Sequence, residues 1–301
     1  MFLSARLIFL AAAMLLGGMV EAGAQAASPS PVATANAKAP APLRVAVYGH
    51  AAPMVFKSGD KYTGIEADFA RGLAAALGRP LQYVDCDWNN LVSALIDDKA
   101  DIIMSGMSIT GLRQVRVAFC FPYLRIGQVP LCRRGELALY GNNASLYNIR
   151  GVVGVVAGTT ADLLAHEQFS YAQREAYPSL KDAVQGLLDK KADLVLTDFP
   201  LALWQSAENE STLAVVPIFL TQEDLAWAVR KDDDALRAAA NVYFLQIKEN
   251  GQLAQIVRKW LPMMADSAIG PSTAPDTALQ AQPTPVPAAQ PQSQPPPGKV
   301  N

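Results

Sequence analysis

The sequence predicts an α/β fold in which two similar lobes share one cleft. Short apolar runs that suit β-strands alternate with segments whose apolar residues recur at helical spacing, as is typical of α/β domains. This order of elements occurs twice along the chain. One stretch is nearly repeated, since residues 94–105 (ALIDDKADIIMS) and 186–197 (GLLDKKADLVLT) are identical at five of twelve positions. A chance likeness between two helix-to-strand turns is the alternative to a duplicated lobe.

In the first half of the chain, the apolar run 43–48 predicts a strand that ends at Gly49. Apolar residues at helical spacing predict a helix over 64–77, and Gly78 and Pro80 close it. The pattern continues with a strand, a helix and a strand, at 81–84, 91–96 and 101–104.

The second half repeats this order with a strand at 152–156, a helix from about residue 161, a helix at 180–188 and a strand at 194–197. Loops at the carboxyl ends of parallel strands gather at one edge of a sheet, so the loops of the two lobes are expected to meet around a cleft. These loops are 48–54, 105–113, 158–160 and 197–198.

Both ends of the chain differ in composition from the body at 43–264. Residues 1–27 are expected to form a secretory signal, with Arg6 before an apolar run of 14 residues, shorter than the ~20 that span a bilayer. A retained membrane anchor is the less favoured alternative. The Ala- and Pro-rich segment 28–42 and the Pro- and Gln-rich segment 265–301 are expected to form an extended linker and a disordered tail.

Composition and motifs argue against several classes of function. The formal net charge is -2, from 25 basic and 27 acidic residues, so no nucleic-acid partner is expected. The histidines and cysteines are few and widely spaced, so no metal site is expected either. No strand is followed by a phosphate-binding loop, a dinucleotide-binding glycine motif or a nucleophile elbow. We therefore expect no cofactor and no catalytic residue.

The three cysteines, Cys86, Cys120 and Cys132, leave two possibilities open. One disulfide with one free thiol fits an exported chain, and so do three buried thiols. The two histidines differ in their expected surroundings. His50 is placed in the first loop, where it can contact a solute, and His166 is expected to be solvated.

Two charged residues in the expected loops are the main candidates for ligand binding. Arg113 follows the hydroxyl-rich segment 105–110, where a guanidinium can hold a carboxylate by two hydrogen bonds. Asp198 ends an apolar run and is placed to meet an ammonium group. A surface arginine at a helix start and an aspartate that caps a helix are the simpler alternatives. Together the two charges suit a small zwitterion, which favours binding over catalysis.

Four further residues accompany this pair. Thr159 and Thr160, between a glycine and a helix, can form a neutral anion site, and helix capping is compatible with that role. Tyr48 and Trp88 are large side chains at a strand end and a helix start. They can line a pocket or belong to the core.

These segments, taken in order, resemble the bacterial extracellular solute-binding proteins of family 3, the polar and general amino-acid-binding components of ABC importers. The resemblance runs from about residue 43 to 261. Each motif is loose alone, but their number and order are specific. The motifs are Leu43 to Val47, Tyr62-Thr-Gly-Ile-Glu-Ala-Asp68, Trp88-Asn-Asn-Leu91, Gly106-Met-Ser-Ile-Thr110 with Arg113, Phe119-Cys-Phe-Pro-Tyr123, Val153-Gly-Val-Val-Ala-Gly-Thr159, Ala192-Asp-Leu-Val-Leu-Thr-Asp198, Trp227-Ala-Val-Arg-Lys231, and Asn250-Gly251 with Trp260.

The resemblance implies a two-lobed periplasmic-binding-protein fold of type II, the Venus flytrap, with two crossing hinge strands near 125–129 and 219–224. The first lobe would be discontinuous, comprising 43–126 and 223–264. The second would comprise 127–222.

The resemblance also implies roles for the site residues. Arg113 would bind the α-carboxylate of the ligand with Ser108 and Thr160, and Asp198 would bind its α-ammonium group. Ser105 and Gly106 would line the same wall, and Trp88 would face the ligand's side chain.

Some positions depart from the family pattern. Ala51 and Met54 flank Pro53 where aromatic residues are usual, which puts a pocket lid in doubt. Tyr48 stands where some binders of basic amino acids carry an acid, so we expect a ligand with a neutral side chain.

The expected protein is therefore a monomeric, periplasmic binding protein and not an enzyme. It would capture a small zwitterion, most simply an amino acid, by lobe closure and deliver it to an inner-membrane ABC permease. A sensor that presents its closed form to a receptor is one alternative. A cyclohexadienyl-dehydratase-like enzyme is another, but it would need a general acid beside the clamp, and residues 199–203 hold no carboxylate.

Overall fold

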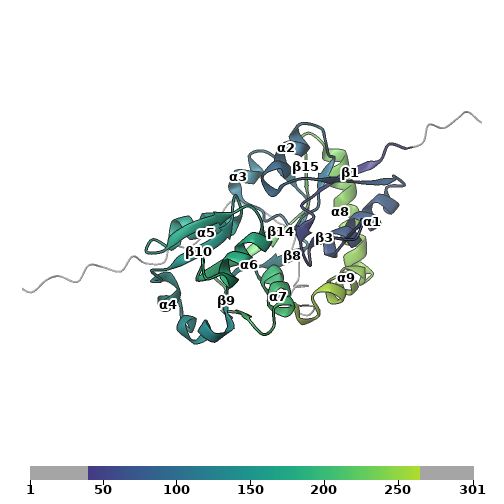
Figure 1. Cartoon of the computed structure of the whole chain (residues 1–301). Coiled ribbons are helices and arrows are strands. Elements are labelled where there is room, and N and C mark those ends of the chain that lie inside the picture. Colours follow the sequence, from purple (N-terminus) through teal and green to yellow (C-terminus); the bar gives the residue numbers. More distant parts are fainter. Residues whose placement is uncertain (1–39, 265–301) are drawn as a thin grey trace, which may run out of the picture. The chain divides into compact units, whose positions relative to one another are not determined.

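Two five-stranded sheets organise residues 40–264, the part of the chain that the computed structural model describes (Figure 1). The first contains, in spatial order, β5 (Leu81–Asp85), β1 (Leu43–Val47), β6 (Ile102–Ile103), β15 (Ala228–Val229) and β7 (Ala118–Phe119). The second contains β11 (Gln173–Tyr177), β10 (Val152–Val156), β12 (Leu194–Asp198), β9 (Gln128–Arg133) and β13 (Leu213–Val215). In both sheets the first three strands pair in parallel and the next two pairings are antiparallel.

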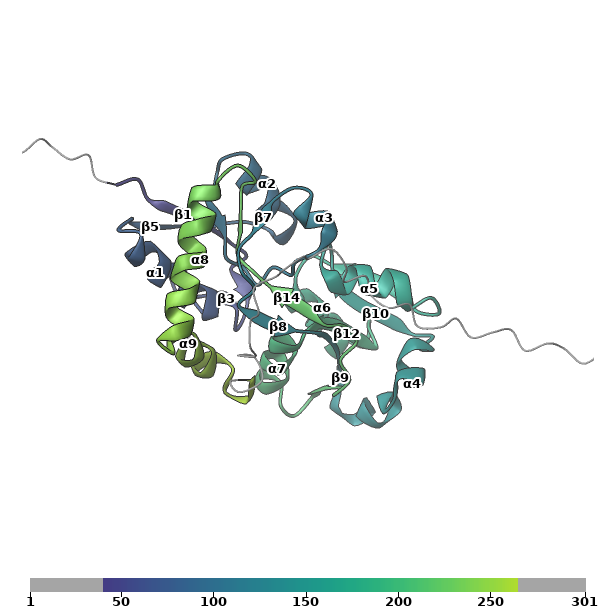
Figure 2. The ribbon, with the colours of Figure 1, turned by 180° about the vertical axis from the view of Figure 1, so that it is seen from behind.

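Helices pack on each sheet. In the first lobe, α1 (Ile65–Ala76) contacts β5, and α2 (Leu91–Ile96) contacts β1 and β6. The long α8 (Asp234–Glu249) and α9 (Gln252–Trp260) return to α1 (Figure 2). In the second lobe, α5 (Thr160–Gln168) and α6 (Leu180–Leu188) contact β10 and β12, and α7 (Phe199–Glu208) contacts β9 and β13. The expected two-lobed α/β fold is thus confirmed.

Smaller elements connect these layers. They are β2 (His50–Ala51), β3 (Val55–Ser58), β4 (Lys61–Thr63), β8 (Leu124–Ile126), β14 (Glu223–Leu225), α3 (Gly111–Gln114), α4 (Asn143–Tyr147), and three 3₁₀-helices at Trp88–Asn90, Arg134–Tyr140 and Pro262–Met264. No helix within residues 40–264 combines the length and the apolar character needed to cross a bilayer. The expected signal at 1–27, the linker up to residue 39 and the tail at 265–301 lie outside the described residues.

The repeated segments 94–105 and 186–197 share a backbone conformation as well as letters. Each runs from the end of a helix, α2 or α6, through a tight turn into the central strand β6 or β12. Asp98 and Lys190, which occupy the same position in the repeat, both adopt the left-handed conformation, with φ of 56° and 61°. Because residues other than glycine rarely adopt this conformation, its recurrence at one position argues against a chance likeness of letters.

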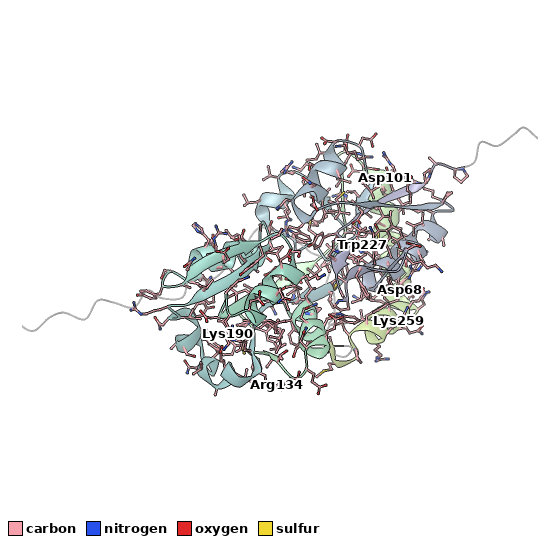
Figure 3. All side chains as sticks on the ribbon, viewed as in Figure 1. Asp68, Asp101, Arg134, Lys190, Trp227 and Lys259 are labelled. Carbon is pink, nitrogen blue, oxygen red and sulfur yellow. The ribbon has the colours of Figure 1, made fainter. Side chains whose placement is uncertain are left out.

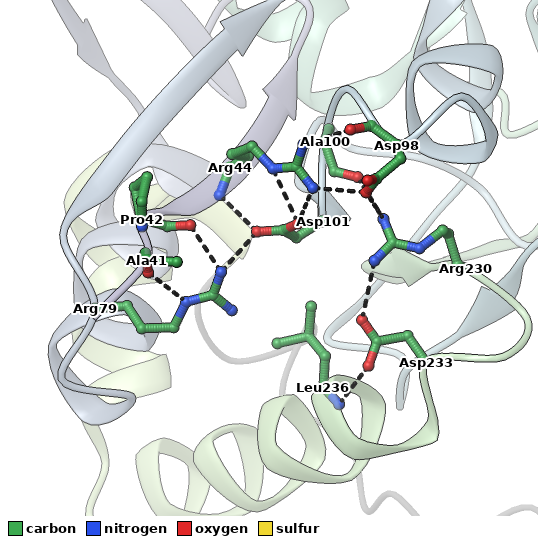
Figure 4. A network of polar contacts seen from close by, with 10 residues as sticks. All are labelled: Ala41, Pro42, Arg44, Arg79, Asp98, Ala100, Asp101, Arg230, Asp233 and Leu236. Carbon is green, nitrogen blue, oxygen red and sulfur yellow. Dashed lines mark hydrogen bonds and ion pairs between the residues drawn. The ribbon is translucent and has the colours of Figure 1, made fainter. Parts of the chain in front are cut away.

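A second feature of the repeat fixes the first strand of each lobe. The carboxylate of Asp101 accepts the backbone N–H of Arg44 at 3.0 Å, within a network that also includes the Arg44 guanidinium (Figure 4). In the second lobe, Asp193 occupies the equivalent position and accepts the backbone N–H of Val152 at 2.8 Å. The same residue type thus ties β1 to β6 and β10 to β12.

The start of α1 depends on a glycine. Gly64 has φ of 114°, and a Cβ there would lie 2.5 Å from the carbonyl oxygen of Met54. The following residues Ile65, Phe69 and Leu73 recur at helical spacing and are fully buried. The glycine therefore allows α1 to lie against the loop before β3, which supplies part of the cleft.

Each lobe has its own apolar core. In the first, Trp227, which is labelled in Figure 3, is almost fully buried and packs with Phe69 and Tyr123. Cys120 belongs to this core and Cys132 to that of the second lobe. All three cysteines are free thiols, so the structure agrees with the possibility that had no disulfide, although Cys86 is only half-buried.

The hinge is a two-stranded ladder in which β8 pairs with β14, with Glu223 opposite Ile126. The chain crosses from the first lobe into β9 directly after β8, and it returns through β14. These strands lie close to the expected crossings at 125–129 and 219–224. The lobe boundaries at 126/127 and 222/223 stay a prediction.

Candidate functional site

A pocket lies where the loops of the two lobes meet. Its empty space of about 600 Å³ includes open solvent. Eight of the nine expected site residues line it, namely Tyr48, Trp88, Ser105, Gly106, Ser108, Thr159, Thr160 and Asp198. The remaining lining side chains are mostly apolar, and they include Met54 from the first lobe and Leu180, Leu196 and Leu201 from the second.

Arg113, the ninth residue, lies in the short helix α3 beside the pocket. Its guanidinium is half-buried, donates one hydrogen bond from Nη1 to the Ser108 carbonyl at 2.9 Å, and lies 5.3 Å from the centre of the Trp88 ring. Among residues 40–264, no carboxylate lies within ion-pair distance of it. Burial lowers its pKa, and the charges of Asp198 and Glu223 oppose this, so the group remains a cation with N–H donors to offer.

Asp198 ends β12 at the N-cap position of α7, but its side chain caps nothing. Instead it accepts a hydrogen bond from the amide Nε2 of Gln128. Burial raises the pKa of Asp198 to about 7, and the charge of Glu223 adds to this rise. The simple capping role is therefore wrong, and the carboxylate is directed to the pocket.

Gln128 is a site residue that the sequence did not suggest. It is fully buried in β9, and its Nε2 also donates to the Thr160 hydroxyl at 3.0 Å. Its Oε1 is buried and has no hydrogen-bond partner among the described residues. A glutamine inside the apolar run of a strand was the only available signal, because a buried amide needs partners.

Glu223 is a second residue that the sequence did not suggest. It belongs to the crossing strand β14, accepts the hydroxyl of Ser108 at 2.6 Å through Oε2, and accepts that of Thr221 at 2.7 Å through Oε1. Thr221 in turn accepts the backbone N–H of Gln128 at 3.0 Å. A chain of hydrogen bonds thus runs from the first lobe through the hinge to the second.

The loop before α5 carries the two threonines. Thr159 is the N-cap of α5: its hydroxyl accepts the Asp162 N–H at 3.2 Å and donates to the Val156 carbonyl at 2.7 Å. Its hydroxyl is therefore committed to capping. Thr160 follows it and receives the Gln128 amide, so its own hydroxyl hydrogen stays available for a ligand.

A seam between the lobes closes one side of the pocket. The indole Nε1 of Trp88 donates to the carbonyl of Gly158 at 3.1 Å. Gly158 has φ of 76°, and a Cβ there would lie 2.0 Å from the Asn89 side-chain oxygen. Farther along the interface, the Phe56 and Trp204 rings lie 5.4 Å apart between centres.

Hydrogen bonds within the first lobe hold its wall of the pocket in place. Ser105 Oγ accepts the Tyr48 N–H at 2.9 Å, and Gly106 N donates to the fully buried Glu66 at 2.6 Å. Tyr123 and Trp227 also donate to Glu66. Burial nevertheless raises the pKa of Glu66 to about 7. These contacts fix the loop but direct the Ser105 hydroxyl oxygen and the Gly106 amide away from a ligand.

Among the aromatic and histidine candidates, Tyr48 is buried, whereas both histidines are exposed. Tyr48 is almost buried and contacts both His50 and Trp88 edge-on, and its hydroxyl has no partner within residues 40–264. His50 is exposed at the pocket rim, and His166 is exposed on α5. In the described part of the chain, no cluster of three or more potential ligands could hold a metal ion.

Comparison with known proteins places this site in a family context. The family model for bacterial extracellular solute-binding proteins, family 3, matches residues 43–263. A cyclohexadienyl dehydratase of Pseudomonas aeruginosa is 31% identical over 234 residues, which are 76% of this chain and 85% of the relative.

Two solved structures are similar throughout the body. An ancestral amino acid-binding protein, described as a precursor of cyclohexadienyl dehydratase, has a TM-score of 0.68 and 32% identity, covering 72% of this chain and 94% of its own. A binding component of an ABC transporter from Wolinella succinogenes, complexed with lysine, has a TM-score of 0.70 and 30% identity, with the same two coverages of 72% and 94%. The chain therefore belongs to the bacterial extracellular solute-binding proteins of family 3.

Proposed function

We propose that this protein binds a small zwitterion, most simply an amino acid with a neutral side chain, and delivers it to an ABC-type permease. The observation that carries the proposal is the complementary charge around one pocket, with Arg113 on the first lobe and Asp198 on the second. The pocket, which Asp198 lines and Arg113 adjoins, is mostly apolar, and this suits an uncharged side chain.

The carboxylate of the ligand would be held at the Arg113 end. Within residues 40–264 the guanidinium donates only one of its N–H groups to the protein, so others can donate in parallel to a carboxylate. Thr160, at the start of α5, can donate its hydroxyl to the same group. Desolvation of this partly buried site strengthens both interactions.

The ammonium group would be held at the Asp198 end. The carboxylate has one oxygen on Gln128 and leaves the other for the ligand. Since its pKa is raised to about 7, the ligand's positive charge would also draw Asp198 into its ionised form.

Binding and closure would be one equilibrium. Arg113 and Asp198 belong to different lobes, so a ligand makes both contacts only when the lobes approach. It therefore shifts the population toward the closed form, which a permease can distinguish from the open one. We propose that the protein acts as a monomer outside the cytoplasmic membrane, exported by the segment at 1–27.

A dehydratase activity is a second candidate, because one relative at 31% identity is a cyclohexadienyl dehydratase and Asp198 has a pKa raised to about 7. Two observations favour binding instead. An amino acid-binding protein of the same lineage matches equally well, at 32% identity. In addition, the α7 residue that lines the pocket is the apolar Leu201. Turnover of prephenate or arogenate by the purified protein would reverse this ranking.

A thermal-shift screen over the twenty proteinogenic L-amino acids, dipeptides and related small acids tests the binding proposal. A ligand at 100 times its dissociation constant stabilises the folded state by about 2.7 kcal/mol. We expect at least one amino acid to raise the melting temperature of the parent protein and not that of R113A. The matched control is R237A, which removes a partly exposed arginine paired with Asp234 on α8, away from the pocket and the hinge. No shift with any amino acid would refute the proposal.

A further inference from the structure

Glu223 is placed to control the ammonium end of the site, although it does not line the pocket. Its two carboxylate oxygens receive the hydroxyls of Ser108 and Thr221, so its position is fixed from both sides of the hinge. Asp224, the next residue on β14, points elsewhere and pairs with the exposed Arg125. The strand thus presents one acid toward the site and one toward the surface.

The contact with Glu223 determines what the Ser108 hydroxyl can do. A serine hydroxyl has one hydrogen and two lone pairs. Its hydrogen is directed to Glu223, with an oxygen–oxygen distance of 2.6 Å. Ser108 also lines the pocket, and toward the pocket its oxygen can therefore only accept hydrogen bonds. An acceptor is the wrong partner for a carboxylate and the right one for an ammonium group.

Three acceptors belong to residues that line this pocket. They are the Ser108 oxygen, the buried Oε1 of Gln128, which has no partner within residues 40–264, and the carboxylate of Asp198. A primary ammonium group has three N–H donors. We propose that Glu223 is a positioning residue of the ligand site, which holds Ser108 as an acceptor and so completes a three-acceptor site for a primary ammonium group. This inference rests on the proposed function.

Glu223 also contributes charge. Asp198 is faced by the Glu223 carboxylate from β14, the Arg113 guanidinium from α3, the Gln128 amide from β9 and the Tyr123 phenol. Burial is the larger cause of its raised pKa, and Glu223 adds to it. Above about pH 7, where Asp198 is ionised, two carboxylates face one guanidinium at this end of the pocket, which favours a cationic group there.

The test compares E223Q with the matched control D224N, which alters the neighbouring carboxylate on the same strand. The first readout needs no ligand: the ¹³C shift of the Asp198 carboxyl is followed between pH 4 and 9. In E223Q we expect the Asp198 midpoint to fall by about one pH unit, because a neighbouring negative charge is removed. In D224N we expect no change.

The second readout is affinity, measured by calorimetry for each of the twenty L-amino acids that binds and for its N-methyl derivative. We expect E223Q and S108A each to weaken binding of the primary amines about 10- to 150-fold at pH 8, the range expected for one lost hydrogen bond to a charged group. D224N should stay within twofold. The N-methyl derivatives, which have one donor fewer, should bind the parent more weakly and lose less in E223Q.

Three outcomes decide the matter. If E223Q behaves as D224N does in both readouts, Glu223 is only a structural hinge residue and the inference is wrong. If S108A binds as the parent does, the three-acceptor site is wrong. If the parent binds no amino acid, the proposed function fails separately, and the Asp198 titration alone then supports or rejects the role of Glu223.

Discussion

At the residue scale, the buried acid Glu66 makes stability depend on pH. Its carboxylate receives three hydrogen bonds, yet burial holds its pKa at about 7, above the 4.5 of a solvated glutamate. The folded protein therefore binds a proton more tightly at this site than the unfolded chain does. The resulting stability is fully present below pH 4.5 and is lost as the pH rises through 7.

This gives a prediction for the free energy of unfolding. Between about pH 5 and 7.5 it should fall with rising pH, with a contribution from Glu66 on the order of 3 kcal/mol. Asp198, with a pKa raised to about 7, adds to the slope in the same window. The lowered pKa values of Asp68, Asp85 and Asp101 act in the opposite direction, but only below about pH 4.

Urea unfolding at several pH values measures this slope in the parent, in E66Q and in the control E249Q, which changes an exposed acid on α8. E66Q should flatten the slope and E249Q should retain it. An equally steep slope in E66Q would show that Glu66 is ionised in the folded protein throughout this range.

At the element scale, the loop between β10 and α5 must approach the first lobe closely. Gly158 in this loop lies against Asn89 and receives the Trp88 indole. In G158A the new methyl group would meet the Asn89 side-chain oxygen at 2.0 Å, so this exposed side chain would have to leave its place in the seam. We expect the affinity for an amino acid that binds the parent to fall at least about tenfold, since both lobes must contact the ligand.

The control for this prediction is G78A. Gly78 is also left-handed, with φ of 61°, but a Cβ there would have no neighbour within 4 Å. Both variants should lose a similar amount of stability from backbone strain, of order 1 kcal/mol. Calorimetric binding should separate them, because only G158A obstructs closure. Equal affinities for the two variants would show that the contact of Gly158 with the first lobe does not contribute to closure.

Most elements could be predicted from the sequence because they follow local patterns. The helices at 91–96 and 180–188 and the strand at 152–156 have the expected bounds. The strand expected at 101–104 is shorter, at 102–103, although the backbone N–H groups of Asp101 and Met104 still donate to the carbonyls of Arg44 and Ala46 in β1. Where a residue's role depends on long-range contacts, local pattern was not enough.

The site residues also divide into those that local pattern could find and those whose role depends on distant partners. Arg113, Asp198 and Thr160 follow strands in recognisable loops, so spacing and the family resemblance could find them. Gln128 and Glu223 lie 70 and 115 positions from their partners Asp198 and Ser108, and nothing near them in the sequence marks this pairing. The N-cap role weighed for the Asp198 side chain was wrong. Its carboxylate instead accepts a hydrogen bond from the Gln128 amide, which is distant in sequence.

At the scale of the whole molecule, duplication explains how one chain builds a two-sided clamp. Each lobe presents the loops after its parallel strands, and the antiparallel hinge ladder β8–β14 joins the lobes. A guanidinium is thereby supplied by one lobe and a carboxylate by the other. Under the proposed function, this division would make ligand binding and lobe closure parts of one equilibrium.

The most direct measurement of this central claim is the affinity of R113A for the amino acid that binds the parent most tightly, measured by calorimetry at pH 8. Removing the guanidinium leaves the ligand's carboxylate unpaired in a partly desolvated site. We expect a loss of about 2 to 5 kcal/mol, which is about 30-fold to several thousand-fold in the dissociation constant. The control R237A, on α8, should bind as the parent does. If R113A bound this amino acid as tightly as the parent, the clamp between Arg113 and Asp198 would be contradicted.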